Sequence, residues 1–338
     1  MKNKRWKQRP KGSNWGEFGE NDQKGRLNLI DHRKVLQAVA EVKVGKTFCL
    51  SLPLDLPGGN LLSPVRFPPQ LRPVIRNEEP YYNYNWQKFD PRMTDIAADD
   101  VVLLHTQYST QWDSLAHRGS LFDANGDGVD EPVYYNGFPA EKALLADTPQ
   151  GTKAQSLGIE NMAEHGVQGR GVMVDLFSVF GETPRKEVGY DDLKRVMDEG
   201  NVTVEKGDIL CLWTGLDQMI LSMNGHPETR LKTSCAVLDG RDEKLLDWIT
   251  ESGIAAIASD NLAVEAVGKP FTDDCCGTSL PLHKRCLFEL GIHLGELWYL
   301  AELAQWLKTN NRSRFLLTAP PLRLTGAVGS PVTPIATV

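Results

Sequence analysis

Residues 105–117 read HTQYSTQWDSLAH, and this stretch says more about the fold than any other part of the chain. If it continues extended from the apolar residues 101–104, alternate side chains share one face. The side chains that then point the same way are His105, Gln107, Ser109, Gln111 and Asp113. The row contains no Lys or Glu, and His117 follows Asp113 by four residues, which favours a functional site. The alternative is an exposed edge strand whose outer face is simply polar.

Around this stretch, the chain from residue 100 onward alternates between strand and helix patterns. We predict strands over residues 101–104, 171–176, 207–213, 254–258 and 315–317, the first of them buried. We predict helices over residues 190–197, 244–251, 280–290 and 297–307. Gly253 and Gly291 are placed to end two of these helices. Such alternation predicts an α/β fold.

The first hundred residues have a different character. Seven prolines lie between residues 53 and 80, which excludes a long helix and favours extended, surface-running chain. The aromatic cluster at residues 81–86 either forms a lid over a substrate or pins an irregular segment to the body. No linker divides the chain. We therefore expect one domain over residues 1–338, with residues 1–100 as a Pro-rich N-terminal elaboration.

Composition excludes several classes of protein. Hydrophobic residues make up 41% of the 338 residues and charged residues 24%, so most of the chain is not disordered. The net charge of −7 argues against nucleic-acid binding, and no apolar run could span a membrane. The basic start lacks the apolar core of a signal peptide. Six cysteines without C-x-x-C spacing suggest reduced thiols in the cytoplasm, with Cys275–Cys276 an incidental pair rather than a redox-active one.

The segment 107–117 resembles the signature His-x-Gly-Thr-His-x-Asp-x-Pro-x-His. This is the signature of the cyclase family of metal-dependent hydrolases, which includes bacterial kynurenine formamidase and isatin hydrolase. Thr110, Asp113 and His117 match it, whereas Gln107 and Gln111 replace its first two histidines. Ser109 and Leu115 replace its Gly and Pro. Further segments similar to the family follow in order over nearly the whole chain, at residues 14–30, 190–215, 259–265, 282–297 and 319–331.

The resemblance implies an α/β fold with a small barrel-like mixed sheet and flanking helices. It also implies a divalent metal held by Gln107, Gln111, Asp113, His283 and Glu296. His117 takes the position of the family's catalytic acid/base. Asp260 and Glu265 either support the ligands or form a hydrogen-bonded pair at a loop end. A loop at residues 123–128 resembles the start of a calcium-binding EF-hand, but the rest of that motif is missing and a turn-rich loop is the better interpretation.

The implied activity is hydrolysis of a C–N bond in an amide, a formamide or a cyclic imide or lactam. The implied cation is Mn²⁺ or Zn²⁺, with Mg²⁺ as a further candidate. Because Gln offers only a neutral amide oxygen, the two glutamines shift the preference toward Mn²⁺, Mg²⁺ or Ca²⁺ and lower the affinity. Trp112 and the aromatic cluster suggest an aromatic or heterocyclic small molecule as substrate, and the family suggests a homo-oligomer. The alternative is a metal-free relative that uses the amides to hold its substrate, for cyclisation, dehydration or binding alone.

Overall fold

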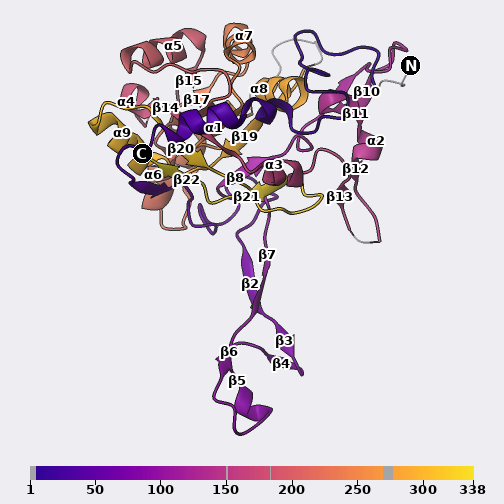
Figure 1. Ribbon diagram of the computed structural model, residues 1–338, viewed down its shortest axis with the longest axis vertical. Coiled ribbons are helices and arrows are strands. Elements are labelled where there is room, and N and C mark those ends of the chain that lie inside the picture. Colours follow the sequence, from indigo (N-terminus) through magenta and orange to yellow (C-terminus); the bar gives the residue numbers. More distant parts are fainter. Residues whose placement is uncertain (1–4, 150, 183, 269–276) are drawn as a thin grey trace.

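The computed structural model describes residues 5–149, 151–182, 184–268 and 277–338 (Figure 1). Its centre is a nine-stranded mixed sheet that curls into a half barrel, which confirms the expected α/β fold. The strand order is β1-β22-β20-β14-β16-β18-β19-β8-β21. Four neighbouring strands run parallel: β14 (Gln168–Asp175), β16 (Ile209–Trp213), β18 (Ala256–Ser259) and β19 (His293–Glu296). The other five pair antiparallel: β1 (Thr47–Cys49), β8 (Gln111–Asp113), β20 (Arg314–Thr318), β21 (Gly329–Pro331) and β22 (Ile335–Thr337).

The parallel strands form because their residues are apolar on both faces, as strands buried between two layers must be. All five residues of β16 are buried. Leu210 and Leu212 pack into the core on one face of the sheet, while Ile209 and Cys211 pack into the core on the other. The strands predicted at residues 171–176, 207–213, 254–258 and 315–317 are therefore confirmed, with small shifts at their ends.

Helices cover both faces of this sheet. The apolar sides of α5 (Tyr190–Glu199) and α7 (Glu243–Ser252) pack on one face, and those of α9 (Ala301–Thr309) and α1 (His32–Val39) on the other. Gly253 ends α7 in the left-handed conformation, as predicted. Shorter helices are α2 (Ala140–Ala143), α3 (Glu160–His165), α4 (Phe177–Phe180) and α6 (Leu216–Ser222). Short 3₁₀ turns are η1 (Gly25–Leu29), η2 (Trp86–Lys88), η3 (Tyr135–Gly137) and η4 (Thr229–Lys232).

Two predicted helices differ in detail. The segment 280–290 forms the single turn α8 (Pro281–His283) followed by η5 (Lys284–Leu290), a π-helix, and Gly291 ends it in the left-handed conformation as expected. The helix predicted from residue 297 begins at Ala301 instead. Leu297 has a positive φ, and the backbone amide of Trp298 is bound to Ser259, so the chain here is tied to the sheet and cannot coil.

A buried ionic network ties α1 to the sheet. Asp208 precedes β16 and accepts two hydrogen bonds from Arg170, at 2.9 and 2.8 Å, and one from Lys34 Nζ at 2.9 Å. Asp208 is fully buried, and only 1% of the Arg170 side chain is exposed. Glu205 and Glu41 also lie 3.0 and 3.8 Å from the Arg170 guanidinium, so each buried charge has an opposite partner, which is the condition for burying it.

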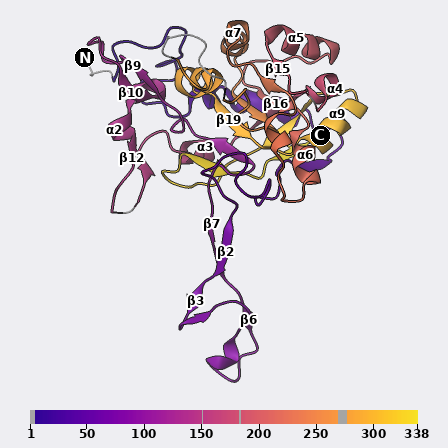
Figure 2. The same cartoon turned by 180° about the vertical axis from the view of Figure 1, so that it is seen from behind.

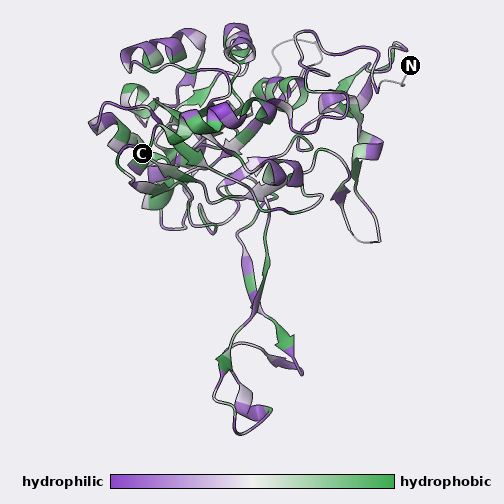
Figure 3. Cartoon of the chain, in the orientation of Figure 1, coloured by the Kyte–Doolittle hydropathy of each residue, from purple (hydrophilic) through white to green (hydrophobic). Residues whose placement is uncertain are grey.

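The prediction of a buried strand at residues 101–104 is wrong. β7 (Asp100–Leu103) pairs with β2 (Gln70–Pro73) to form the stem of an arm that projects from the body (Figures 1 and 2). We call residues 70–103 the arm. All residues of both stem strands are exposed, although β7 is largely apolar (Figure 3). The run was apolar enough for a core strand, but the structure places it in solvent. The absence of a long helix over residues 53–80 is confirmed.

The tip of the arm holds two further two-stranded ladders, β3 (Ile75–Arg76) with β4 (Glu79–Pro80), and β5 (Tyr84–Asn85) with β6 (Ile96–Ala97). The aromatic cluster lies here, with Tyr81 and Tyr84 at a ring-centroid distance of 5.2 Å and Trp86 against both. The rings pack on one another. Neither expectation for them, a lid or an anchor to the body of the same chain, is met.

Smaller sheets complete the body: β9 (Ser120–Phe122), β10 (Glu131–Tyr134) and β11 (Phe138–Pro139); β12 (Leu144–Leu145) with β13 (Lys153–Ala154); and β15 (Glu187–Val188) with β17 (Val237–Leu238). The loop at residues 123–128 joins β9 to β10. Asp123 accepts hydrogen bonds there from the amides of Gly126, Asp127 and Gly128, which confirms a turn-rich loop. Within the described ranges, no helix is long and apolar enough to cross a membrane. Cys275 and Cys276 lie outside the described residues.

Candidate metal centre

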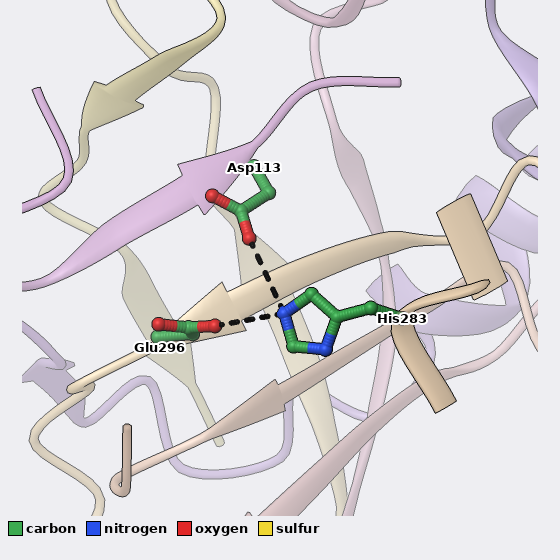
Figure 4. Close-up of side chains that lie close together, drawn as sticks. All are labelled: Asp113, His283 and Glu296. Atoms are coloured by element: carbon green, nitrogen blue, oxygen red, sulfur yellow. Dashed lines mark ion pairs between the residues drawn. The ribbon is translucent and has the colours of Figure 1, made fainter. Parts of the chain in front are cut away.

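Three side chains that can bind a metal ion meet beside β8 and β19 (Figure 4). Asp113 is the last residue of β8, Glu296 is the last residue of the adjacent β19, and His283 ends α8. His283 Nε2 lies 4.0 Å from Asp113 Oδ2 and 3.4 Å from Glu296 Oε1. All three residues are buried, and one ligand atom from each lies within 4.8 Å of the others. One imidazole and two carboxylates at this spacing are a donor set typical of a divalent metal site.

Glu265 fixes the orientation of His283. Its Oε1 accepts hydrogen bonds from the His283 backbone amide and from Nδ1, both at 2.8 Å, and its Oε2 accepts one from the Leu282 amide at 3.0 Å. Because Nδ1 donates to this carboxylate, Nε2 faces Asp113 and Glu296. Of the two interpretations left open for Glu265, its bonds to His283 agree with the support of a candidate ligand, and the role of His283 as a ligand stays a prediction.

Gly240 makes room for this carboxylate. A Cβ at position 240 would lie 2.0 Å from Glu265 Oε2 and 3.1 Å from the Leu282 amide nitrogen. No side chain fits in that space, so Gly240 is part of what holds His283 in place.

Asp260 has a different role from Glu265. It accepts hydrogen bonds from the Thr214 amide and hydroxyl, both at 2.8 Å, and from the Gly215 amide at 2.7 Å. These bonds fix the turn between β16 and α6. Asp217, in the first turn of α6, in turn accepts from the amides of Leu300 and Ala301 at the start of α9. Among the described residues, no hydrogen bond joins Asp260 to Glu265, so the expected pair at a loop end is not formed.

Gln111 and Asp113 each leave a buried acceptor oxygen unused. Gln111 is opposite Glu296 in the β8–β19 ladder, and its Nε2 donates to Glu296 Oε2 at 3.1 Å. Gln111 Oε1 and Asp113 Oδ2 are buried and accept no hydrogen bond from the described residues. A buried acceptor without a partner is costly. Asp113 Oδ2 lies 4.0 Å from His283 Nε2, and a cation held by Asp113, His283 and Glu296 would satisfy this oxygen, so the residues present fit a bound metal ion.

Gln107 turns its amide nitrogen into the site. Nε2 donates to Asp113 Oδ1 and lies 2.9 Å from His117 Nδ1. Since an NH₂ group only donates, His117 Nδ1 accepts, and the imidazole proton lies on Nε2, which is 3.9 Å from Asp113 Oδ2. Gly329 lies opposite Asp113 in β21, and a Cβ there would come within 2.6 Å of Gln107 Cγ. The position of Gln107 thus depends on a glycine in the neighbouring strand.

The expected row of aligned side chains is correct only in part. Gln107, Ser109, Gln111 and Asp113 are all buried, but only residues 111–113 form a strand. His105 is exposed and lies outside the site.

Comparison with known proteins identifies the family of this chain. The family model described as "Putative cyclase" matches residues 50–266. A solved structure of a novel cyclase is 30% identical over 98% of this chain and 100% of that one, with a TM-score of 0.75. This chain belongs to the cyclase family. The resemblance of segment 107–117 to the cyclase signature is thereby confirmed.

Other cyclase-like folds are more distant. Isatin hydrolase A from Labrenzia aggregata, bound to benzyl benzoate, is 11% identical with a TM-score of 0.56, covering 90% of this cyclase and 97% of that chain. An isatin hydrolase bound to the product analogue thioisatinate is 12% identical with a TM-score of 0.54, covering 91% and 99%. At this identity they establish the shared fold. None of the curated proteins matches the sequence.

Burial and neighbouring charges set the protonation of the cyclase site. Burial raises the pKa of Asp113, and burial lowers the pKa of His117, which keeps that imidazole neutral. Burial also opposes a charge on His283, but hydrogen bonds with Glu265 and Glu296 outweigh it and raise the pKa of His283 to about 9. Burial works against the Glu296 carboxylate, yet its bond with His283 lowers the pKa of Glu296. Metal binding at His283 Nε2 would therefore release a proton and strengthen with rising pH.

Two residues of the cyclase site were missed from the sequence. His293 is buried in β19, its Nδ1 lies 2.9 Å from the carbonyl oxygen of Asp113, and burial lowers its pKa to about 4. Arg66, before the arm, donates from Nη1 to the Gln107 carbonyl at 2.9 Å. His293 shares a strand with Glu296, which is a signal that could have been used. Arg66 lies 41 residues from its partner, and nothing in its surroundings singles it out.

Proposed function

We propose that this cyclase is a metal-dependent hydrolase that opens the C–N bond of an amide, a formamide or a cyclic imide or lactam. The observation that carries the proposal is the buried group of Asp113, His283 and Glu296 with unused acceptor oxygens on Asp113 and Gln111. Asp113, His283 and Glu296 would hold the cation, and Gln111 Oε1 is the further ligand. Gln107 would serve as a ligand only if its amide turned to present oxygen.

A divalent cation supplies a Lewis acid for the substrate carbonyl and for water. Mn²⁺ and Zn²⁺ suit one imidazole with two carboxylates, and Mg²⁺ is the further candidate because the remaining donors are oxygens. The chain itself supplies the proton transfer. Gln107 holds the His117 ring through Nδ1, so Nε2 faces the carboxylates and carries the ring proton. Nε2 would give this proton to the leaving nitrogen as a general acid and would take up in its place the proton that the attacking water releases.

The substrate class follows from the site and from its relatives. Isatin is a cyclic amide fused to an aromatic ring, and two proteins with this fold are isatin hydrolases. We therefore propose a small aromatic or heterocyclic amide as substrate, and isatin is the first compound to test.

One observation favours a second candidate. Gln107 presents nitrogen, which cannot bind a metal, at a position where the cyclase signature has a ligand. A metal-free relative would use Gln107 and Gln111 to bind its substrate directly, for a cyclisation or dehydration that relies on His117 and Asp113.

Metal analysis separates the two candidates. Protein purified without chelators is expected to carry about one divalent ion per chain, and Asp113→Asn is expected to lose it because the central carboxylate is gone. Asp123→Asn, in the β9–β10 loop, is the matched control and should keep the ion. Far less than one ion per chain, together with turnover that chelators do not affect, would contradict the metal-dependent function and support the second candidate.

Gly240→Ala is expected to weaken metal binding by roughly 10- to 100-fold, because the added methyl group displaces Glu265 and with it the His283 ring. Titration of the chelator-stripped variant with Mn²⁺ measures the effect. Glu265→Gln, which keeps the size of the side chain but removes its charge, should weaken binding in the same direction. Unchanged affinity in both variants would show that His283 needs no support.

A further inference from the structure

The segment just before the arm, residues 57–66, lies against the stretch of chain that carries Gln107. The Tyr108 hydroxyl donates to the Gly59 carbonyl at 2.9 Å, and Arg66 Nη1 donates to the Gln107 carbonyl at 2.9 Å. Each is a single hydrogen bond to a backbone carbonyl, and water can replace it when the segment moves. These bonds hold the segment beside the candidate site without fixing it there permanently.

A small cavity lies between this segment and the metal centre. Gln107 lines the cavity, and its side chain also donates to Asp113 in the centre. The cavity holds about 10 Å³, which is room for about one water molecule, so an amide substrate enters only when residues 57–66 move outward. Arg66 is the one charged side chain among the described residues that line the cavity. Its apolar lining includes Pro57, Leu61, Leu62 and Leu262.

The half-buried Arg66 brings a positive charge to the centre without an acidic partner. A guanidinium has five N–H groups, and one of them binds the Gln107 carbonyl. Within the described parts of the chain, Arg66 makes no ion pair and no second hydrogen bond. Burial has the largest effect on the pKa of His117 and of Glu296, and the Arg66 charge lowers both, so this charge is felt at the centre. A guanidinium with free N–H groups at this place suits an anionic group of a ligand.

We propose that Arg66 determines the specificity of this cyclase by binding a carboxylate of the substrate. The inference rests on the proposed function, because it names the substrate class of the same site: an amide that also carries a carboxylate. A carboxylate accepts two parallel hydrogen bonds from one guanidinium, which a single backbone carbonyl cannot do. Closing of residues 57–66 over such a substrate is therefore favoured. A substrate without the carboxylate, such as isatin, leaves Arg66 without this partner.

The competing explanation is that Arg66 only balances the charge of the centre. Asp113, Glu265 and Glu296 are three carboxylates, so a divalent cation would leave one negative charge for Arg66 to cancel. Any cation at position 66 would then serve, and Lys would be equivalent to Arg. Recognition of a carboxylate needs the planar fork of a guanidinium, so Lys would recover only part of the affinity.

The binding of matched amides tests the proposal. Formanilide is an uncharged aromatic formamide, and 2-, 3- and 4-formamidobenzoate are the same molecule with a carboxylate at different distances from the amide. At least one isomer is expected to bind about 10- to 100-fold more tightly than formanilide. Calorimetric titration of the His117→Ala variant gives the dissociation constants, so that the measurement does not depend on turnover. If no isomer binds more tightly than formanilide, the proposal is overturned.

Substitutions of Arg66 in the same background complete the test. Arg66→Met should weaken the tightest formamidobenzoate about 10- to 100-fold and formanilide less than about threefold, since only the first has a carboxylate. Arg66→Lys should recover only part of the loss. Arg72→Met removes the same charge from the exposed stem of the arm, so it is the matched control and should bind both compounds normally.

Circular dichroism shows whether each Arg66 variant is folded, and the preference of the protein with Arg66 intact for a charged amide decides if Arg66→Met is not. Equal losses for charged and uncharged amides, or a Lys variant that binds as tightly as Arg, would overturn the proposal. Neither result bears on the metal-dependent function, which the metal content of the Asp113→Asn variant tests separately.

Discussion

His117→Ala is expected to lower the rate of isatin hydrolysis by roughly 10²- to 10⁴-fold, the usual contribution of a general acid/base. The imidazole lies beside Asp113, burial lowers its pKa so that the ring is neutral, and Gln107 holds it in place. Metal content should not change, because the variant keeps Asp113, His283 and Glu296. Turnover is measured by the loss of isatin absorbance, and on a series of cyclic imides and formamides if isatin is not hydrolysed.

His105→Ala is the matched control, since His105 lies in the same stretch but is exposed. It should retain the native rate. A His117→Ala variant that also retains it would remove His117 from the proposed mechanism.

The same assignment predicts the pH dependence of turnover. Burial lowers the pKa of His117 below its ordinary value of 6.5, so the imidazole stays neutral in mildly acidic solution. The proton relay proposed for His117 needs this neutral form of the ring. The acid limb of kcat/KM should therefore lie below pH 6.5, with activity lost as the pH falls through the lowered pKa. An acid limb above pH 6.5 would point to another group.

Asp208→Ala is expected to lower the free energy of unfolding by about 3–5 kcal/mol, the largest effect on stability predicted here. The substitution leaves Arg170 and Lys34 buried without the carboxylate that pairs them. Glu205, 3.0 Å from Arg170, is half exposed and pairs with only one of the two cations. Urea unfolding followed by circular dichroism gives the measurement.

An exposed ion pair provides the comparison for Asp208. Asp198 pairs with Lys194 on the surface of α5, where both side chains are well exposed. Asp198→Ala should change the free energy of unfolding by less than about 1 kcal/mol. Equal effects of the two substitutions would show that the buried network contributes no more than a surface pair.

The central sheet could be predicted because the sequence of each parallel strand is itself typical of a buried strand. Residues 209–213 are apolar on both faces, and only burial between two layers suits such a strand. Residues 101–104 are equally apolar but lie in the arm. An apolar pattern predicts that a strand will be buried, but it does not show whether the rest of the same chain buries it. The single domain over residues 1–338 stays a prediction.

The site could be predicted only to the level of residue type. Asp113 and His117 were identified from their spacing, and His283 and Glu296 from the family resemblance, and the structure brings all four together. The sequence could not show that Gln107 turns its amide nitrogen toward Asp113, because the residue type does not determine whether the nitrogen or the oxygen of the side-chain amide faces a neighbour. It also could not separate Glu265 from Asp260, since each follows β18 and the difference lies in which distant amides reach them.

The carboxylate of Glu265 binds both the backbone that begins α8 and the ring that α8 presents. Folding of that helix and binding of an ion at the metal centre are therefore thermodynamically coupled. An ion that binds the folded chain raises the free energy of unfolding in proportion to ln(1 + [ion]/Kd), and the unfolding temperature rises with it. Thermal melting in a series of divalent salts would then rank the ions by affinity before any substrate is known. Glu265→Gln should reduce the differences in unfolding temperature between the ions.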